Sequence, residues 1–600
     1  MDNSIAVLDF GGQYAHLIAN RVRRLGVYSE IFDGQTPAEK LKDYKGIILS
    51  GGPQSVYGYD AIHCDKKILD LNVPLLGICY GHQLLAYIQG GEVVNVSERE
   101  YGPSALDIKK SEGIFKNIYG KKTVWMSHGD TIAKLPDNYE IIASTSDCEY
   151  AAIANFKKNY YGTQFHLEVT HTQSGQEMLG NFLDICGCSR DWKIENFIDQ
   201  EMETIKKQVG NRKVFMMVSG GVDSTVAFVL LEKTLGRERV YGLFVDTGFM
   251  RLGEKEEVSS SLSGLGFNNL HIRDESKRFF QALKEKYDPE AKRKIIGDLF
   301  LKVQADVVKD LKLNSEEWLL GQGTIYPDTI ETGGTKHAAK IKTHHNRVPQ
   351  IEELMQAGRI IEPLAQLYKD EVREVGLRLG LPEKIVWRHP FPGPGLAVRC
   401  LCAHEASYPE HHVLVEKKIN NMIHPFNLTA KILPVKSVGV QGDYRTYQHP
   451  LAIIGNGKWE NFGPLATQLI NQFKEINRVI WLCEPNIIDS LSVQKKYLSE
   501  ERIQMLQKAD AMVHEFLFEY GLYSDIWQFP VVLLPVSVNR ESGEAIVLRP
   551  VSSEEAMTAN FYPMEHKLLQ QLSKKLMNIP GITAVFYDIT NKPPGTIEWE

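Results

Sequence analysis

A glycine-rich turn, Ser219-Gly-Gly-Val-Asp-Ser224, constrains the fold of this chain more than any other segment. The apolar run 214–218 before it is typical of a buried parallel strand, and residues 225–231 after it have helical character. The turn therefore leads into a helix N-terminus, where unpaired backbone N–H groups and the helix dipole favour an anion. Glycine lets the backbone curl around phosphate oxygens, and the hydroxyl side chains of the segment add donors. The pattern predicts a phosphate-binding strand–turn–helix unit.

The turn lacks the lysine of the G-x-x-x-x-G-K-[ST] motif, so γ-phosphoryl transfer of the usual P-loop kind is not expected. Its S-G-G-x-D-S pattern resembles the PP-loop of the ATP pyrophosphatases, which cleave ATP between the α and β phosphates to adenylate a substrate. The resemblance implies an ATP and pyrophosphate site made of Ser219, Gly220, Gly221, Val222, Asp223, Ser224 and Thr225. The alternative is a glycine-rich turn without a ligand, which leaves the six-residue match unexplained.

Composition restricts the class of protein. A chain of 600 residues predicts several domains, and the 43% hydrophobic and 24% charged fractions are those of an ordinary globular protein. The net charge of -7 argues against a nucleic-acid partner. No apolar stretch is long enough to span a membrane and no signal peptide is recognised, so we expect a cytoplasmic protein with no membrane partner.

The eight cysteines are too few for a disulfide scaffold in a chain of this length. Two C-x-C pairs, Cys186/Cys188 and Cys400/Cys402, lack the C-x-x-C spacing of zinc sites. We therefore expect reduced and mostly buried thiols and no zinc.

Strand and helix patterns predict an α/β chain of two parallel-sheet, doubly wound domains followed by a duplicated α+β region. Runs at 5–9, 46–50 and 74–78 suit a buried parallel sheet, and a second α/β pattern begins at residue 214. The predicted domains are 1–188, a connecting helix at 189–210, a PP-loop domain at 211–399, and two C-terminal subdomains at 400–510 and 511–600.

The duplication rests on a weak internal repeat, in which Leu433-Pro-Val-Lys-Ser-Val438 recurs as Leu534-Pro-Val-Ser-Val538. Each copy is followed by a further strand-like run, at 476–481 and at 582–587. Chance similarity between short strands is the alternative.

A candidate nucleophile, Cys79, lies in Gly77-Ile-Cys-Tyr-Gly81 between a strand and a helix. This is the cysteine counterpart of the G-x-S-x-G nucleophile elbow, and a helix N-terminus lowers the pKa of a thiol. A lone buried cysteine is commoner than a catalytic one, but a base and an orienting carboxylate follow at His166 and Glu168. Backbone N–H groups near Gly51 and Gly52 are suited to an oxyanion hole.

These segments, with Ser50-Gly-Gly-Pro53, resemble the class I glutamine amidotransferases, which release ammonia from glutamine through a thioester. The resemblance implies a Cys79–His166–Glu168 triad and an oxyanion hole at Gly52 and Tyr80. Two residues depart from the family pattern. His82 replaces a Met-like residue, and Leu167 replaces proline. We keep His166 as the base and interpret His82 as a packing or gating variation.

The amidotransferase and PP-loop segments together resemble the glutamine-hydrolysing GMP synthetase family over essentially the full length. The supporting segments are 288–297, 321–324, 341–346, 388–395, 438–447 and 592–600. The longer members of that family carry two C-terminal units where shorter members carry one and dimerise. We therefore expect a monomer, with a dimer as the alternative.

The resemblance implies that Mg²⁺-ATP adenylates xanthosine monophosphate (XMP) and that ammonia from glutamine then displaces AMP to give GMP. Asp223 is the candidate Mg²⁺ residue, because hard cations take carboxylate and phosphate oxygens. The implied XMP contacts are Arg293, Asp443, Gln528, Lys592 and Glu598. A solvated helix face is the alternative for the basic triplet at 292–294. Two departures, Thr247 and Ile325-Tyr326, concern adenine and lid contacts.

Two other functions remain open at this point. A glutamine-dependent ligase that makes NAD would share the PP-loop, but it leaves the tail at 592–600 unexplained. A catalytically silent binding protein would explain the departures at His82, Leu167 and Thr247, but not the intact Cys79 and Asp223. Alkylation of Cys79 distinguishes the last case.

Overall fold

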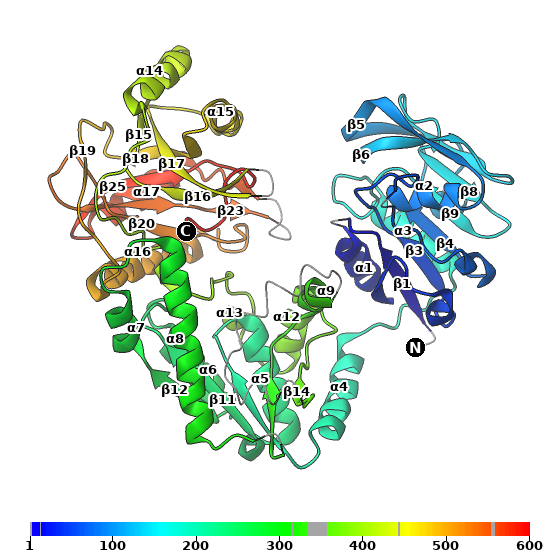
Figure 1. Ribbon diagram of the computed structural model, residues 1–600, viewed down its shortest axis with the longest axis horizontal. Helices are drawn as coiled ribbons and strands as arrows, with labels where there is room; N and C mark the ends of the chain where they lie inside the picture. The colour runs from blue at the N-terminus through cyan, green and yellow to red at the C-terminus, as the bar shows by residue number, and fades with distance from the viewer. Residues whose placement is uncertain are drawn as a thin grey trace. The chain divides into compact units, whose positions relative to one another are not determined.

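The computed structural model describes residues 3–12, 14–59, 61–314, 316–333, 354, 357–441, 444–553 and 559–600 (Figure 1). They form two compact units, the first made chiefly of residues 1–200 and the second of nearly all the rest. Each unit has its own sheets and its own apolar core.

Parallel strands form the centre of the first unit, drawn in blue to cyan in Figure 1. Its nine-stranded sheet has the order β2-β1-β3-β4-β9-β8-β7-β5-β6, in which the first five strands are parallel and the rest antiparallel. The strands are β1 (Ser4–Asp9), β2 (Tyr28–Asp33), β3 (Gly46–Leu49), β4 (Leu75–Ile78), β5 (Glu92–Ile108), β6 (Lys121–Lys134), β7 (Glu140–Ser144), β8 (Ala152–Asn155) and β9 (Tyr160–Thr163).

The helices of this unit are α1 (Ala15–Arg24), α2 (Tyr80–Tyr87) and α3 (Gly175–Ile185), with 3₁₀ turns η1 (Ala38–Leu41), η2 (Lys66–Asp70) and η3 (Gly113–Phe115). Strands β3 and β4 are buried throughout, which explains why their sequences are continuous apolar runs and not alternating ones. The predicted connecting helix is present as α4 (Ile194–Val209).

A five-stranded parallel sheet in the order β12-β11-β10-β13-β14 begins the second unit. Its strands are β10 (Lys213–Met217), β11 (Val240–Asp246), β12 (Leu270–Asp274), β13 (Trp318–Gly321) and β14 (Ile360–Ile361). Its helices are α5 (Val222–Leu235), η4 (Arg237–Arg239), α6 (Glu254–Gly264), α7 (Ser276–Leu283), α8 (Pro289–Asp310), α9 (Tyr326–Gly333), α12 (Lys369–Arg378), α13 (Glu383–Val386) and η5 (Gly395–Val398).

A seven-stranded sheet follows, with the main order β15-β17-β18-β25-β22-β20 and β16 paired to β17. Its strands are β15 (Thr429–Ile432), β16 (Ser437–Gln441), β17 (Tyr444–Ile454), β18 (Ile476–Glu484), β20 (Val531–Leu534), β22 (Glu544–Leu548) and β25 (Ile582–Asp588). Two small pairs, β19 (Leu491–Val493) with β21 (Val536–Val538) and β23 (Val551–Ser552) with β24 (Asn560–Phe561), lie beside it. The helices are α14 (His412–Ile423), η6 (His424–Phe426), α15 (Trp459–Gln472), α16 (Glu500–Glu519) and α17 (His566–Met577).

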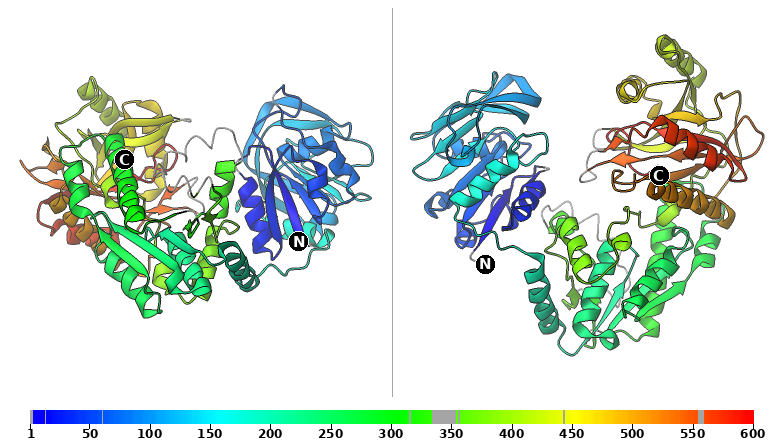
Figure 2. Two further views of the ribbon diagram at one scale, coloured as in Figure 1. Left: turned by 60° about the horizontal axis from the view of Figure 1, so that its bottom comes forward. Right: turned by 180° about the vertical axis from the view of Figure 1, so that it is seen from behind.

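The predicted duplication is visible in this sheet, because its order is the same from either edge. In the first half β17 pairs antiparallel with β15 and parallel with β18, and in the second half β22 pairs antiparallel with β20 and parallel with β25. The halves meet at the antiparallel β18–β25 pair, so yellow and orange-to-red strands lie side by side in Figures 1 and 2. The boundary expected at residue 510 falls inside α16, which packs on β20 and α17 of the second half.

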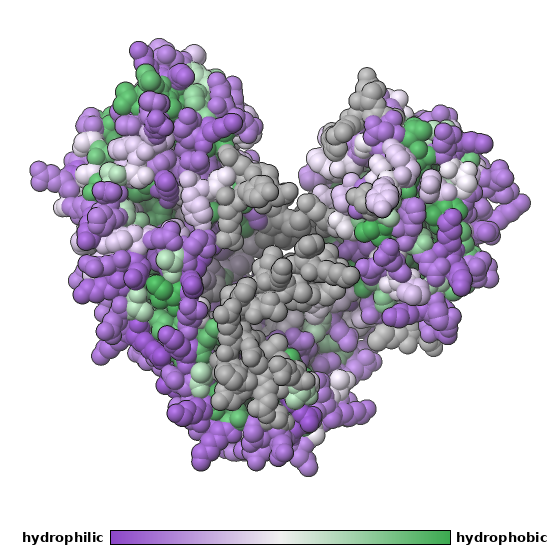
Figure 3. Space-filling model, viewed as in Figure 1, coloured by the Kyte–Doolittle hydropathy of each residue, from purple (hydrophilic) through white to green (hydrophobic). Residues whose placement is uncertain are grey.

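The surface seen in Figure 3 is mostly hydrophilic, with hydrophobic residues in separate small areas. Among the described residues, no helix combines the length and apolar character that crossing a membrane requires.

Candidate active sites

The first candidate site is built on a sharp turn between β4 and α2. Cys79 occupies this turn with φ 52° and ψ -107°, a strained conformation for a non-glycine residue. The turn is possible only because its neighbours lack side chains. A Cβ on Gly81 would lie 2.1 Å from Leu49 O, and one on Gly77 would lie 2.4 Å from Gly81 O. The predicted nucleophile elbow is therefore present, and Cys79 precedes the first turn of a helix.

His166 and Glu168 lie beside Cys79, on the segment that follows β9. His166 Nδ1 is 2.7 Å from Glu168 Oε1, and both side chains are buried. The backbone fixes the imidazole further, because His166 N donates to Trp125 O and Thr172 Oγ1 donates to His166 O. The three predicted residues are thus brought together.

Burial alone would lower the pKa of His166, but the Glu168 carboxylate and the Cys79 side chain raise this pKa well above its usual 6.5. The raised pKa follows from an opposite charge at hydrogen-bond distance in a low-dielectric site. It favours the imidazolium form of His166, which is the form that the side chain takes once it has accepted a proton.

Further residues lie near the Cys79 thiol or beside the turn that carries it. Cys79 Sγ donates to Ser127 O at 3.5 Å, and Gln164 Nε2 lies 3.8 Å from Cys79 Sγ. A Cβ on Gly51 would lie 3.3 Å from His166 Cε1 and 3.8 Å from Cys79 Cβ, so Gly51 leaves open the space in front of the nucleophile. A Cβ on Gly52 would lie 3.2 Å from Tyr80 Cγ. The two residues predicted for the oxyanion hole are therefore neighbours.

The two departures from the family pattern have separate consequences. His82 is fully buried, a Cβ on Gly162 would lie 2.4 Å from its Nδ1, and burial lowers its pKa to about 3. It is a neutral packing residue. Leu167 is 2% exposed, and the 2.7 Å contact of His166 with Glu168 is kept without the proline.

The second candidate site lies at the carboxyl end of β10, where Gly220 has φ +80°. Ser219 N donates to Ser224 Oγ at 3.1 Å, and Gly221 N donates to Ser219 Oγ at 3.3 Å. Thr225 Oγ1 donates to Gly221 O at 2.9 Å. The predicted turn therefore closes on itself through its own hydroxyl groups at the start of α5.

Two cations from distant segments contact this turn. Lys369 Nζ, at the start of α12, lies 2.7 and 2.6 Å from the two carboxylate oxygens of Asp223. Arg388 Nη1 donates to Gly220 O at 2.5 Å, and Arg388 Nη2 pairs with Glu254 Oε1 at 2.7 Å. Sequence reasoning missed both roles. Lys369 is 146 residues from Asp223 and Arg388 is 168 from Gly220, and no local pattern links them.

No group of three or more His, Cys, Asp or Glu side chains arranged to hold a metal occurs among the described residues. This does not conflict with Mg²⁺ at Asp223, because Mg²⁺ bound with ATP typically uses one or two carboxylates, substrate phosphates and water. The Asp223 carboxylate lies in the turn at 219–225, and a Mg²⁺ ion held there together with a nucleotide would share this carboxylate with Lys369.

Five residues are predicted to contact the acceptor. Three of them, Arg293, Gln528 and Glu598, belong to the tail at 592–600 or contact it. Gln528 Nε2 lies 3.3 Å from Glu598 Oε1, and Arg293 Nη2 donates to Glu600 O. Lys592 pairs through its backbone with Ala559, and burial lowers the pKa of its side chain. Asp443 lies outside the described residues, as does the segment 341–346.

The contacts of Lys292 show the environment of the basic triplet at 292–294. Its side chain is 1% exposed and pairs with Glu600, and its Nζ donates to Cys400 O at 3.0 Å. The triplet is therefore not a simple solvated helix face. Arg399, also missed from sequence, is fully buried and donates to both oxygens of Glu598 at 2.9 and 2.8 Å.

Thr247 and Tyr326, the other departures, are buried. Thr247 Oγ1 accepts from Phe249 N at 3.3 Å, and the Tyr326 ring packs edge-on against Tyr368.

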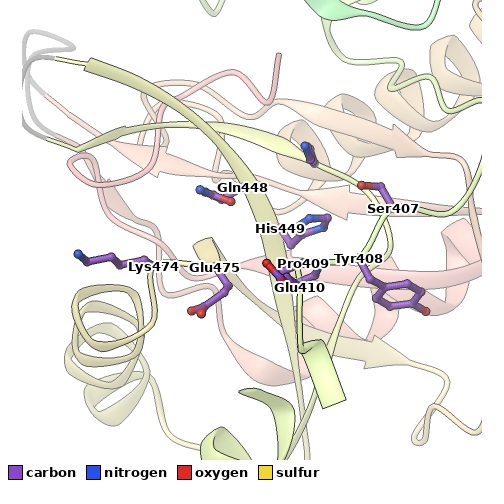
Figure 4. A pocket seen from close by; sticks show the side chains of 9 residues that line it. Ser407, Tyr408, Pro409, Glu410, Gln448, His449, Lys474 and Glu475 are labelled. Carbon is purple, nitrogen blue, oxygen red and sulfur yellow. The ribbon is translucent and has the colours of Figure 1, made fainter. Parts of the chain in front are cut away.

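A separate pocket of about 420 Å³ lies in the first half of the seven-stranded sheet (Figure 4). Its lining residues are Ser407, Tyr408, Pro409, Glu410, Lys436, Gln448, His449, Lys474 and Glu475. The backbone position of His449 matches that of Glu544 in the second half, because His449 N donates to Glu475 O and Glu544 N donates to Gly581 O. Arg502 contacts Glu544 at 2.6 to 3.0 Å, whereas His449, which is 2% exposed, is among the residues that line the pocket.

The two candidate sites lie in segments that match known protein families. Residues 6–186 match the family model of class-I glutamine amidotransferases, and residues 192–302 match the model described as NAD synthase. Residues 515–599 match the model of the GMP synthase C-terminal domain. The first two matches define a glutamine amidotransferase joined to an ATP-using PP-loop synthetase.

Full-length relatives identify the family. The chain is 48% identical to a probable GMP synthase (glutamine-hydrolyzing) of Leptospira interrogans over 604 residues, with 99% of each chain covered. It is 39% identical to the GMP synthase (glutamine-hydrolyzing) of Caldicellulosiruptor saccharolyticus over 606 residues, again with 99% of each covered. The corresponding protein of Dictyostelium discoideum is 37% identical over 675 residues, which cover 99% of this chain and 94% of that one. The chain belongs to the glutamine-hydrolysing GMP synthase family, and it is an enzyme of that class.

Proposed function

We propose that this enzyme aminates XMP to GMP through an adenyl-XMP intermediate, with ammonia from glutamine, and releases AMP, pyrophosphate and glutamate. The observation that carries the proposal is the pairing of a Cys79–His166–Glu168 cluster with a PP-loop and with a C-terminal tail held by Arg399 in one chain. The NAD synthase model matches only the PP-loop region, whereas the tail belongs to the GMP synthase model. This favours XMP over a nicotinate dinucleotide as the acceptor.

In the glutaminase reaction, Cys79 Sγ attacks the carboxamide carbon of glutamine, and His166 takes the thiol proton. The same proton goes to the departing nitrogen, so ammonia leaves and a thioester remains. Glu168 orients and charges the imidazole through its 2.7 Å contact. Backbone N–H groups at Gly52 and Tyr80 stabilise the oxyanion, a position supported by the closeness of these residues to each other and to the elbow. Water then hydrolyses the thioester to glutamate.

In the adenylation reaction, the XMP C2 oxygen attacks the α-phosphorus of ATP, and pyrophosphate departs into the turn at 219–225. The backbone N–H groups of the turn and the Lys369 ammonium can neutralise its charge. Mg²⁺, held by Asp223 and the phosphates, would supply further charge neutralisation. Ammonia attacks the adenylated carbon, and AMP is the leaving group.

The acceptor binds at the tail, with Arg293, Gln528, Lys592 and Glu598 as contacts, together with Asp443. The cationic residues Arg293 and Lys592 suit the phosphate of XMP. Glu598 is fixed by Arg399 and accepts from Gln528, so its carboxylate can accept hydrogen bonds from the purine ring.

The chain functions as a monomer, because the second half of the C-terminal sheet already pairs β25 with β18 of the first half. Light scattering of the unliganded enzyme checks this, and a stable dimer would contradict it.

The direct test is to incubate the purified enzyme with XMP, Mg²⁺-ATP and glutamine and to measure GMP, AMP and pyrophosphate. All three products in equal amounts are expected. Formation of glutamate alone would support the glutaminase reaction and would refute XMP as the acceptor. GMP formed with ammonium but not with glutamine would refute the role of Cys79.

A further inference from the structure

Six charged side chains, three of them buried and three partly buried, form a continuous path between the PP-loop and the C-terminal tail. We refer to them as the charge path; they are the three cations Arg388, Arg251 and Arg399 and the three carboxylates Glu254, Asp510 and Glu598. Their formal charges cancel. They come from four separate stretches of the second unit, so only the folded protein brings them together.

One end of the charge path holds the PP-loop. Arg388 Nη1 donates to Gly220 O at 2.5 Å and Arg388 Nη2 contacts Glu254 Oε1 at 2.7 Å. The other carboxylate oxygen of Glu254 accepts from the backbone N–H of Arg251 at 3.0 Å. A displacement of Arg251 would therefore be passed to the backbone that curls around the phosphates.

The other end holds the tail. Arg399 Nε and Nη2 donate to the two oxygens of Glu598 at 2.9 and 2.8 Å, the bidentate geometry that fixes a carboxylate in orientation as well as in position. Gln528 is tied to the same carboxylate and to Pro390 O. The ring centroid of Phe391 lies 4.5 Å from Arg251 Cζ and 5.2 Å from Arg399 Cζ.

Asp510, on α16, lies between the two ends. Asp510 Oδ2 is 3.6 Å from Arg251 Nε and 3.3 Å from His514 Nδ1, and Asp510 Oδ1 is 4.0 Å from Arg399 Nη1. These are ion-pair separations without hydrogen bonds to the arginines. Within the described part of the chain, Asp510 Oδ1, Arg251 Nε and Arg399 Nη1 have no hydrogen-bond partner.

The Asp510 carboxylate is charged despite its burial. Burial alone would raise its pKa, but His514, Arg251 and Arg399 together lower the pKa to about 2. A charged group with unused hydrogen-bonding capacity, 2% exposed, is costly for stability. Asp510 lies between Arg251, whose backbone contacts Glu254, and Arg399, which holds Glu598.

We propose that Asp510 is a positioning residue for the synthetase reaction, which holds Arg251 and Arg399 in register so that the PP-loop and Glu598 present ATP and the acceptor to each other. This inference rests on the proposed function, because it takes the turn at 219–225 as the ATP site and Glu598 as an acceptor contact. Asp510 itself touches neither substrate.

The test compares Asp510→Asn with Glu515→Gln, which removes the same charge from an exposed position on the same helix. GMP synthesis is measured with ammonium as nitrogen donor, so that the glutaminase site plays no part. For Asp510→Asn we expect the KM values for XMP and ATP to rise together, each on the order of tenfold, the size typical of coupling between two sites. Glu515→Gln should leave both unchanged.

A double-variant cycle with Glu598→Gln separates positioning from loss of stability. If Asp510 acts through Arg399 and Glu598, adding Asp510→Asn to Glu598→Gln raises the XMP KM little further. A lower melting temperature with unchanged KM values, or a fully additive XMP effect, would overturn the inference. If Asp510→Asn does not fold, Arg399→Lys keeps the charge but loses the bidentate contact, and an unchanged XMP KM for that variant refutes the inference equally.

Failure of the proposed function gives a different result. In that case the unsubstituted enzyme makes no GMP from XMP, ATP and ammonium. An active unsubstituted enzyme whose Asp510→Asn variant behaves as Glu515→Gln refutes the inference alone.

Discussion

Backbone geometry positions Cys79, whereas charged side chains from distant segments position the PP-loop and the tail. At the glutamine site, Gly77 and Gly81 leave no room for a side chain, and His166 and Glu168 are two residues apart in sequence. At the nucleotide site, Lys369 and Arg388 reach the turn from 146 and 168 residues away. The first site is therefore set by local chain conformation, and the second depends on the packing of a whole unit.

Because of this difference, the two sites should respond differently to amino-acid substitutions. Substitutions at the glutamine site should affect one reaction and leave the other intact, because its contacts lie within the first unit. Substitutions of single ions in the second unit should affect both nucleotide substrates, because the charges share partners.

Cys79→Ala should produce the largest effect. Loss of the nucleophile should reduce glutamine-dependent GMP synthesis by about 10⁴-fold or more, since no other group can form the thioester. Synthesis from ammonium should persist, as measured by GMP formation with each nitrogen donor. Cys188→Ala, another thiol of the same unit, is the control. Loss of the ammonium reaction in Cys79→Ala would show that the sites are not separable.

Asp223→Ala should have the next largest effect. It should impair GMP synthesis and leave the chemistry at Cys79 intact. Removing the carboxylate leaves the Lys369 ammonium without its 2.6 Å partner and removes the proposed Mg²⁺ ligand. GMP synthesis from either nitrogen donor should fall on the order of 10³-fold. A glutamine analogue should still label Cys79, detected by mass spectrometry. As a control, Asp306→Ala removes an exposed carboxylate and should leave GMP synthesis intact. Unaltered GMP synthesis in Asp223→Ala would show that Asp223 is not part of the site.

Glu168→Gln should lower glutamine-dependent activity by about 10²-fold and also change the pH dependence of stability. Glu168 raises the His166 pKa above 6.5, so the stability gained from the charged pair is full below pH 6.5 and is lost as pH rises through the raised pKa. The melting-temperature difference between parent and variant should therefore shrink from pH 6.5 into the alkaline range. A difference that is constant over this range would mean that His166 is not charged in the folded enzyme.

The sequence was sufficient where the determinants are local. The elbow at Cys79, the turn at 219–225 and the parallel strands were predicted within a few residues, because glycine spacing and continuous apolar runs restrict the backbone directly. Lys369, Arg399 and Asp510 were missed, because a lone charged residue on a helix has no pattern that names its partner. The two C-terminal copies were recognised, but not their shared sheet, since strand pairing across β18 and β25 joins residues about a hundred positions apart.

His82→Met should have the smallest effect and tests whether the glutamine site is set by backbone alone. His82 is fully buried, and burial lowers its pKa to about 3. Met has a similar volume, so the free energy of unfolding should change by no more than about 1 kcal/mol. Glutamine-dependent kcat/KM should change by less than about threefold, because His82 contacts neither the Cys79 thiol nor Glu168. A larger loss with an unchanged melting temperature would give His82 a part in gating, and the elbow would then depend on a side chain behind it as well as on its glycines.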